Sequence, residues 1–338
     1  MKDRLAQADK EATDAAARAK CALSERADYP VRLPFLTTRD EAPLALATLL
    51  ERAELDALVE PLIDRTIEVC RAVLAAHVLG PRDLAEVIAW LASQPWCDGN
   101  VGMYGTSYSG VNSLQMACEQ PPELKAVIAI YATDDRHTDD VHYMGGLRKW
   151  IDLVDYCHYM TPMNALPPVP AVFGPSWRTE WMARIAEHEP WLLTWMRHQH
   201  DDAYWRHGSV RPAYDRIACP TMIVAGWADG YRNNSFRMME KLAENDVPRR
   251  LPAGPRAHAA TSSSLPGPRT DPVPEMVRWW ERWLRGIENG IDGEPEAVWY
   301  AQPSHRPEPD HDHVPGERPA HTWPTERPSA PDPALTGA

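Results

Sequence analysis

The apolar residues of the chain follow one pattern up to about residue 80 and a different pattern beyond it. Residues 1–28 are rich in alanine and charged side chains, which predicts an exposed helix. Residues 31–36 predict a short strand interrupted by Pro34. Between 41 and 79, apolar residues recur at helical spacing and predict further helix. They are Leu44, Leu46, Leu49, Leu50, Leu55, Leu58, Leu62, Ile63, Val69, Val73 and Leu74. The pattern predicts an atypical helical region over residues 1–80.

Beyond residue 81 the pattern becomes that of an α/β protein. An apolar stripe predicts a helix over 82–93, and a turn then leads into a short strand at 101–104. A helix over 108–120 and a second apolar strand at 126–131 complete a βαβ unit, which implies a parallel sheet. Another buried strand is expected at 219–226, with helices at 236–245 and 275–288. We therefore expect an α/β core with a parallel sheet over residues 81–300.

Two segments depart from this alternation of strands and helices. Residues 141–215 are rich in Trp, Tyr, Met, His and Pro and have helical stretches near 178–206, which favours an inserted helical cap. Residues 301–338 combine Pro, His, Asp and Glu without periodicity, which is typical of a disordered tail.

Composition and charge exclude several classes of function. The formal net charge of −13 would repel a phosphate backbone, so no nucleic-acid partner is expected. No apolar run is long enough to span a membrane, and the charged start lacks the apolar core of a signal peptide. The six cysteines are scattered without C-x-x-C spacing, which predicts reduced, mostly buried thiols and a cytoplasmic protein.

The segment Gly105-Thr106-Ser107-Tyr108-Ser109-Gly110 lies between the predicted strand 101–104 and helix 108–120. A nucleophilic serine at the top of a parallel sheet needs such a sharp strand-to-helix turn, with small neighbours that allow the backbone to bend. The turn also points the N–H of Tyr108 toward a developing oxyanion. A glycine-rich turn with an incidental serine gives the same pattern, so the motif alone does not decide.

Partners for Ser107 occur downstream in the order Ser, Asp, His that α/β-hydrolases use. Asp229 follows the predicted strand 219–226, at the sheet edge where such proteins place their sites. His258 lies about thirty residues later, in a loop before the helix at 275–288. Taken singly, Asp229 fits an ordinary turn residue and His258 a structural histidine. The ordered set of three predicts a catalytic triad that needs no cofactor.

These segments resemble the cocaine-esterase and X-prolyl dipeptidyl-peptidase (CocE/NonD) family of serine hydrolases. The resemblance runs from about residue 83 to 307 and includes the G-x-S-Y-x-G turn at 105–110 and the segments 132–146, 195–210, 225–233 and 278–291. It implies Ser107 as nucleophile, Asp229 as the orienting acid, His258 as base and the Tyr108 N–H as an oxyanion donor. It also implies a helical cap over the acyl pocket.

The sequence departs from that family in four respects. Residues 1–80 do not resemble its opening strands, and its C-terminal β-sandwich is missing, so we expect a shortened relative with a sheet incomplete on the N-terminal side. The family's second oxyanion donor is a tyrosine from an early loop, and Phe35, the nearest counterpart, cannot donate. The residues around His258, Arg256 and 259–262, lack the family's aromatic character, so we expect His258 to be less well held.

Other polar clusters favour structural roles. His198, His200 and His207 with Asp201 and Asp202 match no tetrahedral zinc spacing, and 310–313 in the tail resembles a metal site in composition alone. The acidic residues of 134–140 predict a solvated or capping loop, with a smaller chance that one carboxylate lines the substrate site. Trp279, Trp280 and Trp283 predict a packing face.

The sequence thus predicts hydrolysis of a small-molecule ester or a peptide, the latter as removal of X-Pro dipeptides, through an acyl-enzyme on Ser107. Two alternatives stay open. One is a catalytically impaired, truncated remnant of such a hydrolase, and the other is an acyltransferase.

Overall fold

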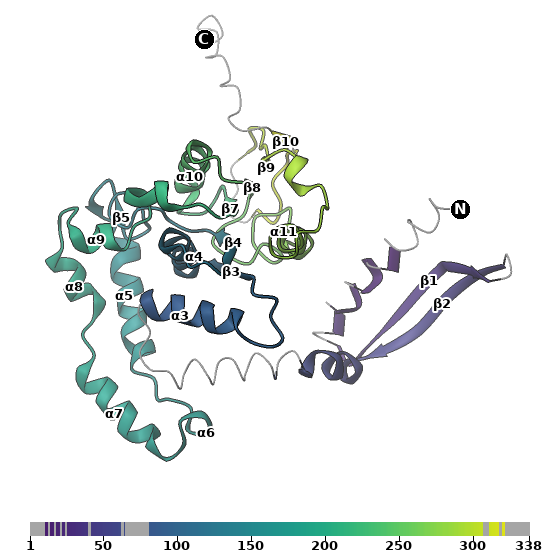
Figure 1. Cartoon of the computed structure of the whole chain (residues 1–338), viewed down its shortest axis with the longest axis horizontal. Helices are drawn as coiled ribbons and strands as arrows, with labels where there is room; N and C mark the ends of the chain where they lie inside the picture. Colours follow the sequence, from purple (N-terminus) through teal and green to yellow (C-terminus); the bar gives the residue numbers. More distant parts are fainter. Residues whose placement is uncertain are drawn as a thin grey trace, which may run out of the picture. The chain divides into compact units, whose positions relative to one another are not determined.

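The computed structural model describes residues 11–12, 14–16, 18–20, 22–23, 26–39, 42–61, 64, 81–306, 311–317 and 320–321. The chain divides into two compact units, residues 1–79 and 80–338 (Figure 1). Each unit has its own buried cluster of apolar side chains, and each is described here by itself.

Residues 1–79 contain a long antiparallel hairpin. Strand β1 (Asp28–Arg39) pairs with β2 (Ala42–Glu51), and the register shifts between Leu33 and Thr37, around the expected interruption. Leu46 and Leu50 pack on a small cluster that β1 shares with helical residues of 11–23. The helix predicted from residue 41 is therefore wrong for Ala42–Glu51, where even-numbered leucines follow the period of a strand. Residues 52–61 are helical, and most of 62–80 lies outside the described residues.

The second unit contains a six-stranded sheet in the order β10-β9-β8-β7-β4-β3. Its strands are β3 (Val101–Thr106), β4 (Leu124–Ile130), β7 (Thr221–Gly226), β8 (Arg249–Gly254), β9 (Ala297–Trp299) and β10 (Ala320–His321). The first five run parallel, and β10 is antiparallel to β9. The predicted α/β fold is confirmed. Within the described residues β3 forms one edge of this sheet, as expected of a sheet that is incomplete on its N-terminal side.

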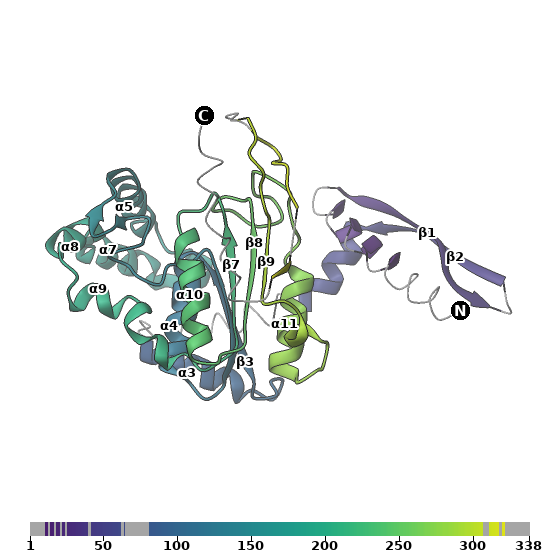
Figure 2. The ribbon, with the colours of Figure 1, turned by 90° about the horizontal axis from the view of Figure 1, so that it is seen from above.

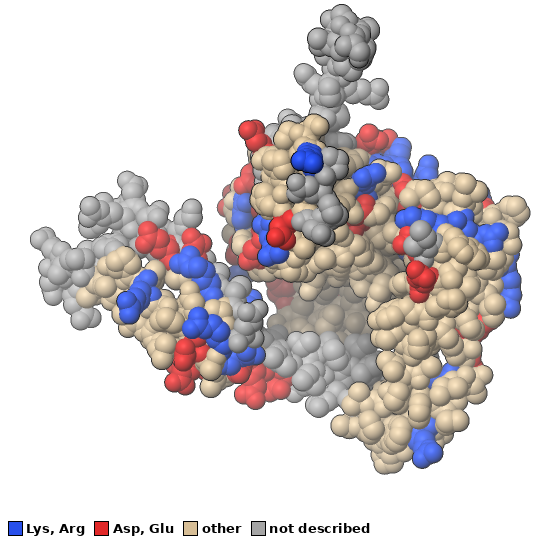
Figure 3. All heavy atoms as spheres, turned by 180° about the vertical axis from the view of Figure 1, so that it is seen from behind, with Lys and Arg blue, Asp and Glu red and all other residues tan. Residues whose placement is uncertain are grey.

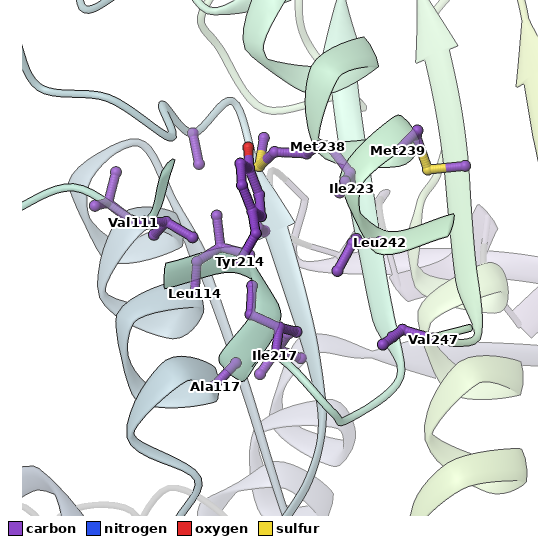
Figure 4. Close-up of a cluster of buried hydrophobic side chains, with 14 of the residues drawn as sticks. Val111, Leu114, Ala117, Tyr214, Ile217, Ile223, Met238, Met239, Leu242 and Val247 are labelled. Atoms are coloured by element: carbon purple, nitrogen blue, oxygen red, sulfur yellow. The ribbon is translucent and has the colours of Figure 1, made fainter. Parts of the chain in front are cut away.

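Helices cover both faces of this sheet (Figure 2). On one face lie α3 (Pro81–Ala92), α4 (Tyr108–Glu119) and α10 (Arg232–Glu244), and on the other lies α11 (Val273–Arg285). Because side chains alternate along a strand, Val127 and Ala129 of β4 enter the first layer, while Ile128 and Ile130 enter the second. The first layer is the larger core, in which α4 and α10 pack with Tyr214 and Ile217 (Figure 4).

The segment between β4 and β7 holds a group of shorter elements. These are β5 (Tyr143–Met144), β6 (Leu147–Arg148), α5 (Trp150–Asn164), α6 (Pro170–Phe173), α7 (Trp177–Glu187), α8 (Trp191–Arg197) and α9 (Ala203–His207), with 3-10 segments at Gly174–Ser176 and Arg211–Arg216. Their shared core contains Tyr143, Leu153, Cys157, Trp195 and Trp205. In it the ring of Trp205 contacts the rings of Tyr143 and Trp195 at tilted angles. We call α5–α9 the cap helices.

The C-terminal region differs from its prediction. A further 3-10 turn, Ile291–Gly293, leads into β9. Val314 is buried and its carbonyl accepts a hydrogen bond from the Tyr300 hydroxyl, and β10 extends the sheet. A disordered tail from residue 301 is therefore wrong for the described residues up to 321, and 322–338 lies outside them.

The cysteines of the described residues are free thiols. Cys118 and Cys157 are buried, and Cys97 and Cys219 are half-buried. Burial raises the pKa of the Cys118 thiol to about 12, so it stays protonated and unreactive at neutral pH.

The surface and the helix lengths bear on possible partners. None of the helices in the described part of the chain has the length and apolar character needed to cross a membrane. On the face shown in Figure 3, lysine and arginine are interspersed with acidic residues among a larger uncharged area.

Candidate active site

Ser107 lies at the sharp turn between β3 and α4. Its backbone has φ 63° and ψ −128°, a combination that non-glycine residues rarely adopt. The conformation is held on both sides. The Ser107 N–H donates to the Ile130 carbonyl of β4 (2.8 Å), and its own carbonyl accepts from the N–H groups of Gly110 and Val111 (2.9 and 3.1 Å). Strain that is held in this way is typical of functional turns.

The two glycines of the predicted motif have a steric reason to be there. A Cβ on Gly105 would lie closer than 3.0 Å to the backbone of Ser109, and one on Gly110 would lie 2.9 Å from the Gly105 carbonyl oxygen. Helix α4 therefore approaches the end of β3 too closely for any side chain. Gly110, one position later than the second glycine of the G-x-S-x-G pattern, thus allows the same close packing of helix against strand.

Tyr108 is the first residue of α4. The first N–H groups of a helix have no partner inside it and carry its positive end, so the Tyr108 N–H suits an oxyanion. The Tyr108 side chain is exposed and forms part of the pocket described below. The expected absence of a second donor at Phe35 concerns a side chain that lies outside the described residues.

Asp229 follows β7 and is held in place by its own loop. Its side chain is 1% exposed, and its Oδ1 accepts from the Tyr231 N–H at 2.7 Å. Its other oxygen, Oδ2, lies 2.6 Å from the Nδ1 of His258. Backbone bonds from Trp227 to Gly254 and from Ala228 to Arg256 tie this loop to the one that carries His258. The sequence-predicted pair is therefore brought together.

His258 follows β8, and two tyrosine rings lie beside its imidazole. The ring centroids of Tyr131 and Tyr231 are each 5.6 Å from that of His258. The sequence on either side of His258 lacks aromatic residues, and these rings come instead from the loops after β4 and β7. Tyr131 directly follows Ile130, the residue that accepts from Ser107, so the Ser107 turn is joined to the histidine through β4.

Sequence reasoning missed both tyrosines as site residues. Tyr131 stands directly after a buried strand and Tyr231 two residues after Asp229, and these positions were the available signal. Burial raises the pKa of Tyr131 to about 12 against the opposing charge of Arg256. Burial raises the pKa of Tyr231 as well, and the Asp140 charge adds to that effect. Both rings are therefore neutral at physiological pH.

A pocket of about 580 Å³ opens beside the Ser107 turn. It begins at Tyr108 and is lined mainly by aromatic side chains of the cap helices. The lining residues are Tyr108, Arg136, Tyr156, Met160, Trp191, Thr194, Trp195, Tyr204, Trp205, His207 and Gly208. Burial, followed by the neighbouring Tyr108, raises the pKa of Tyr156, so the pocket wall is uncharged there.

Arg136 brings the one permanent charge among those lining residues. Its guanidinium lies 3.0 Å from an oxygen of Asp140, whose side chain is 1% exposed. His142, next to this pair, packs between Tyr156 and Trp195 at 4.8 and 5.0 Å. Burial lowers the pKa of His142, although the Asp140 charge opposes this, so the imidazole is neutral at pH 7.

The acidic loop at 134–140 differs from the solvated loop that the sequence predicts. Asp134, Asp139 and Asp140 are buried, because the loop packs under the cap and against α10. Arg237 donates to Asp134 and Asp139 at 2.5 and 2.9 Å, and the Tyr214 hydroxyl donates to Asp134. Asp135 does cap its turn, since it accepts from the His137 and Thr138 N–H groups.

The cluster at 198–207 in the cap is held by local contacts. The Nδ1 of His198 lies 2.6 Å from Asp202, which also accepts from the Tyr204 N–H at the start of α9. Asp201 pairs with Arg206 at 3.2 Å. These contacts are those of a structural cluster. Asp310 of the tail lies outside the described residues.

The parallel sheet and the strained serine turn at its edge define an α/β-hydrolase-like protein. Residues 78–260 match the family model described as X-Pro dipeptidyl-peptidase (S15 family), and the chain belongs to this family. The resemblance inferred from the sequence is thereby confirmed.

Individual relatives agree with that assignment. The chain is 27% identical over 254 residues to the cocaine esterase of Rhodococcus sp. (strain MB1 Bresler), covering 65% of this chain and 43% of the relative. It therefore spans less than half the length of that curated protein. Among solved structures, a CocE/NonD family hydrolase from Staphylococcus aureus superposes with a TM-score of 0.51 at 20% identity, over 72% of this chain and 38% of the other. That likeness concerns the fold.

The N-terminal unit matches a different family. Residues 2–89 match the Hsp70 family model. A segment of 75 residues, 22% of this chain, is 44% identical to the chaperone protein DnaK of Stenotrophomonas maltophilia and covers 12% of it. Residues 1–79 therefore resemble part of an Hsp70 protein and are not altered opening strands of the hydrolase.

Proposed function

We propose that the chain is a serine hydrolase that cleaves an ester or amide through an acyl-enzyme. The observation that carries this is the Asp229–His258 hydrogen bond, at the same sheet edge as the strained Ser107 turn. A bond from Nδ1 to a carboxylate fixes the imidazole tautomer and leaves Nε2 to accept a proton.

In the proposed mechanism, His258 takes the hydroxyl proton as the Ser107 oxygen attacks the carbonyl carbon. The carbonyl oxygen becomes an oxyanion, which the Tyr108 N–H stabilises. As the intermediate collapses, the imidazolium returns the proton to the leaving alcohol or amine. Water then repeats the sequence on the acyl-enzyme, releasing the acid and restoring Ser107.

The pocket beside Tyr108 supports an apolar acyl group. Its aromatic walls would bury such a group, and the Arg136 charge is balanced by Asp140. A free ammonium, as on an X-Pro dipeptide, would find no unpaired carboxylate among the residues that line it. We therefore favour esters over X-Pro peptides as substrates.

A panel of p-nitrophenyl esters with short, long and aromatic acyl groups, run beside an X-Pro p-nitroanilide, tests this proposal. We expect ester hydrolysis above the buffer rate in the wild type, with Ser107→Ala reduced to that background. Equal rates for the wild type and Ser107→Ala would support the impaired remnant instead. Accumulation of a transesterified product when an alcohol is added would support the acyltransferase.

A further inference from the structure

The imidazole of His258 is partly exposed to solvent, so its immediate surroundings restrict its motion only weakly. Its side chain is 42% exposed, and its Nδ1 forms a hydrogen bond with Asp229. A single hydrogen bond leaves the ring free to swing about that contact. Some other contact has to fix the plane of the ring if Nε2 is to face Ser107.

Tyr131 and Tyr231 supply contacts from two separate loops. Their rings meet the imidazole at equal distances, 5.6 Å, and at interplanar angles of 47° and 61°. Both tyrosines are buried, at 1% and 5% exposure, so they are fixed by the protein around them. Tyr231 also donates its backbone N–H to Asp229, so one residue contacts both members of the pair.

The backbone of Tyr131 is held in an unusual conformation. Its φ is +49°, in the left-handed region that a tyrosine rarely occupies, and its N–H donates to the Val224 carbonyl of β7 at 3.0 Å. Its hydroxyl is buried and has no hydrogen-bond partner among the residues that the structure describes. The left-handed backbone and the buried hydroxyl both cost free energy. We therefore attribute the role of Tyr131 to its ring and not to its hydroxyl.

We propose that Tyr131 and Tyr231 are positioning residues that bracket the His258 imidazole and keep it aligned with Asp229. This rests on the proposed function for its catalytic consequence. Each ring lies 5.6 Å from the imidazole, centroid to centroid, within the range over which aromatic rings contact one another.

The test compares Tyr131→Leu with Tyr131→Phe in the full chain. Losing the ring should lower kcat for an ester substrate by about tenfold, the size of one aromatic ring contact, with KM within about twofold. Phenylalanine keeps the ring and should retain the wild-type kcat. Tyr231→Leu is the second variant and should behave as Tyr131→Leu. Tyr300→Leu, which removes an equally buried ring with no described contact to His258, is the control for general packing.

A spectroscopic readout keeps this test separate from the proposed function. The proton between Nδ1 and Asp229 should give a downfield NMR signal in the wild type and in Tyr131→Phe. That signal should broaden in Tyr131→Leu as the imidazole moves and exchanges with water. An unchanged signal and kcat in Tyr131→Leu, or an equal loss in Tyr131→Phe, would overturn the proposal. If the wild type shows the signal but hydrolyses no ester, the proposed function is refuted, whereas the positioning of His258 by the two tyrosines is not.

Discussion

Ser107 and Asp229 illustrate two ways in which this fold prepares a side chain. Ser107 is presented by a backbone conformation that costs on the order of 1–3 kcal/mol and is offset by hydrogen bonds to β4 and α4. Asp229 is presented by burial, with both carboxylate oxygens occupied. Both preparations are complete before any substrate arrives, which is the condition for electrostatic stabilisation of a transition state.

Asp229→Asn tests the orienting role of the carboxylate. The amide presents an N–H₂ group to a ring nitrogen that should donate, so the imidazole tautomer is no longer fixed correctly. We expect kcat to fall by about 10³–10⁴-fold while KM changes little. Steady-state kinetics on the preferred ester measure this, with circular dichroism to verify the fold. A variant with kcat within tenfold of the wild type would contradict the assigned role.

The sequence was sufficient to predict site residues whose position follows from the order of motifs and strands along the chain. Ser107, Asp229 and His258 lie on the expected strand ends, and the structure joins two of them directly. Tyr131 could not be predicted, because its role depends on a left-handed backbone and on a neighbour 127 positions away in the chain. The burial of Asp134 was missed because its partner, Arg237, lies on a distant helix.

The elements around the site are packed so closely that their glycines cannot be replaced. At the turn from β3 to α4, two glycines allow the backbone of the helix to contact the backbone at the end of the strand. The cap has the opposite character, with large tilted rings packed around a buried histidine. The first arrangement gives rigidity at Ser107, and the second provides an apolar pocket.

Gly105→Ala tests the close packing of the turn. Its new methyl group would overlap the backbone of Ser109, which cannot move without shifting α4. We expect a loss of about 1–3 kcal/mol in the free energy of unfolding, together with loss of activity. Gly293→Ala is the matched control, since a Cβ there meets no atom within 4 Å. Urea denaturation of both variants measures the difference, and equal stabilities would contradict the packing argument.

His142 predicts how the cap responds to acid. Burial lowers its pKa in the folded chain below the ordinary histidine value of 6.5, so below that pH the unfolded chain binds a proton that the folded chain excludes. Its contribution to stability is therefore complete above pH 6.5 and is lost as the pH falls toward the folded pKa. Asp140, Asp152, Arg136 and Lys149 are the charged groups that act on it.

Thermal melting followed by tryptophan fluorescence at pH 7 and pH 5 checks this prediction. The wild type should lose more stability on acidification than His142→Phe, in which the titrating group is gone. His200→Phe, at an exposed position, should behave as the wild type. The same pH dependence in all three proteins would show that His142 does not titrate as proposed.

The whole molecule joins segments that match two unrelated families. Residues 78–260 match the S15 hydrolases and residues 2–89 match Hsp70, and the division into compact units falls at 79/80. The leucine pattern of the first unit was interpreted as helix, because over a short run Leu44, Leu46 and Leu50 fit both the helical period and the two-residue period of a strand. Pairing with β1 decides between them, and pairing is a tertiary property.

All of the proposed site residues lie between Ser107 and His258, within the second unit. A chain of residues 80–338 should therefore hydrolyse the preferred ester with the kcat and KM of the full chain. Purification of both proteins and parallel steady-state assays measure this. A folded 80–338 protein with kcat more than tenfold lower would show that residues 1–79 contribute to the site.

Stability of the hydrolase unit should depend on the buried ions around Asp134. Arg237→Met leaves two carboxylates in the interior without their cation, and one of them, Asp134, is 0% exposed. We expect a loss of about 3 kcal/mol. Arg216→Met breaks a pair with Glu119 in which both side chains are 50% exposed, and should cost less than about 1 kcal/mol. Denaturant unfolding compares the two, and similar losses would contradict the assignment.

The central claim is that His258 activates the Ser107 hydroxyl. The most direct measurement is fluorophosphonate labelling of the full chain, followed by intact-mass analysis and peptide mapping. We predict one adduct per chain on the peptide containing Ser107, abolished in Ser107→Ala and strongly slowed in His258→Gln. An unlabelled wild type, or an adduct that persists in Ser107→Ala, would contradict it.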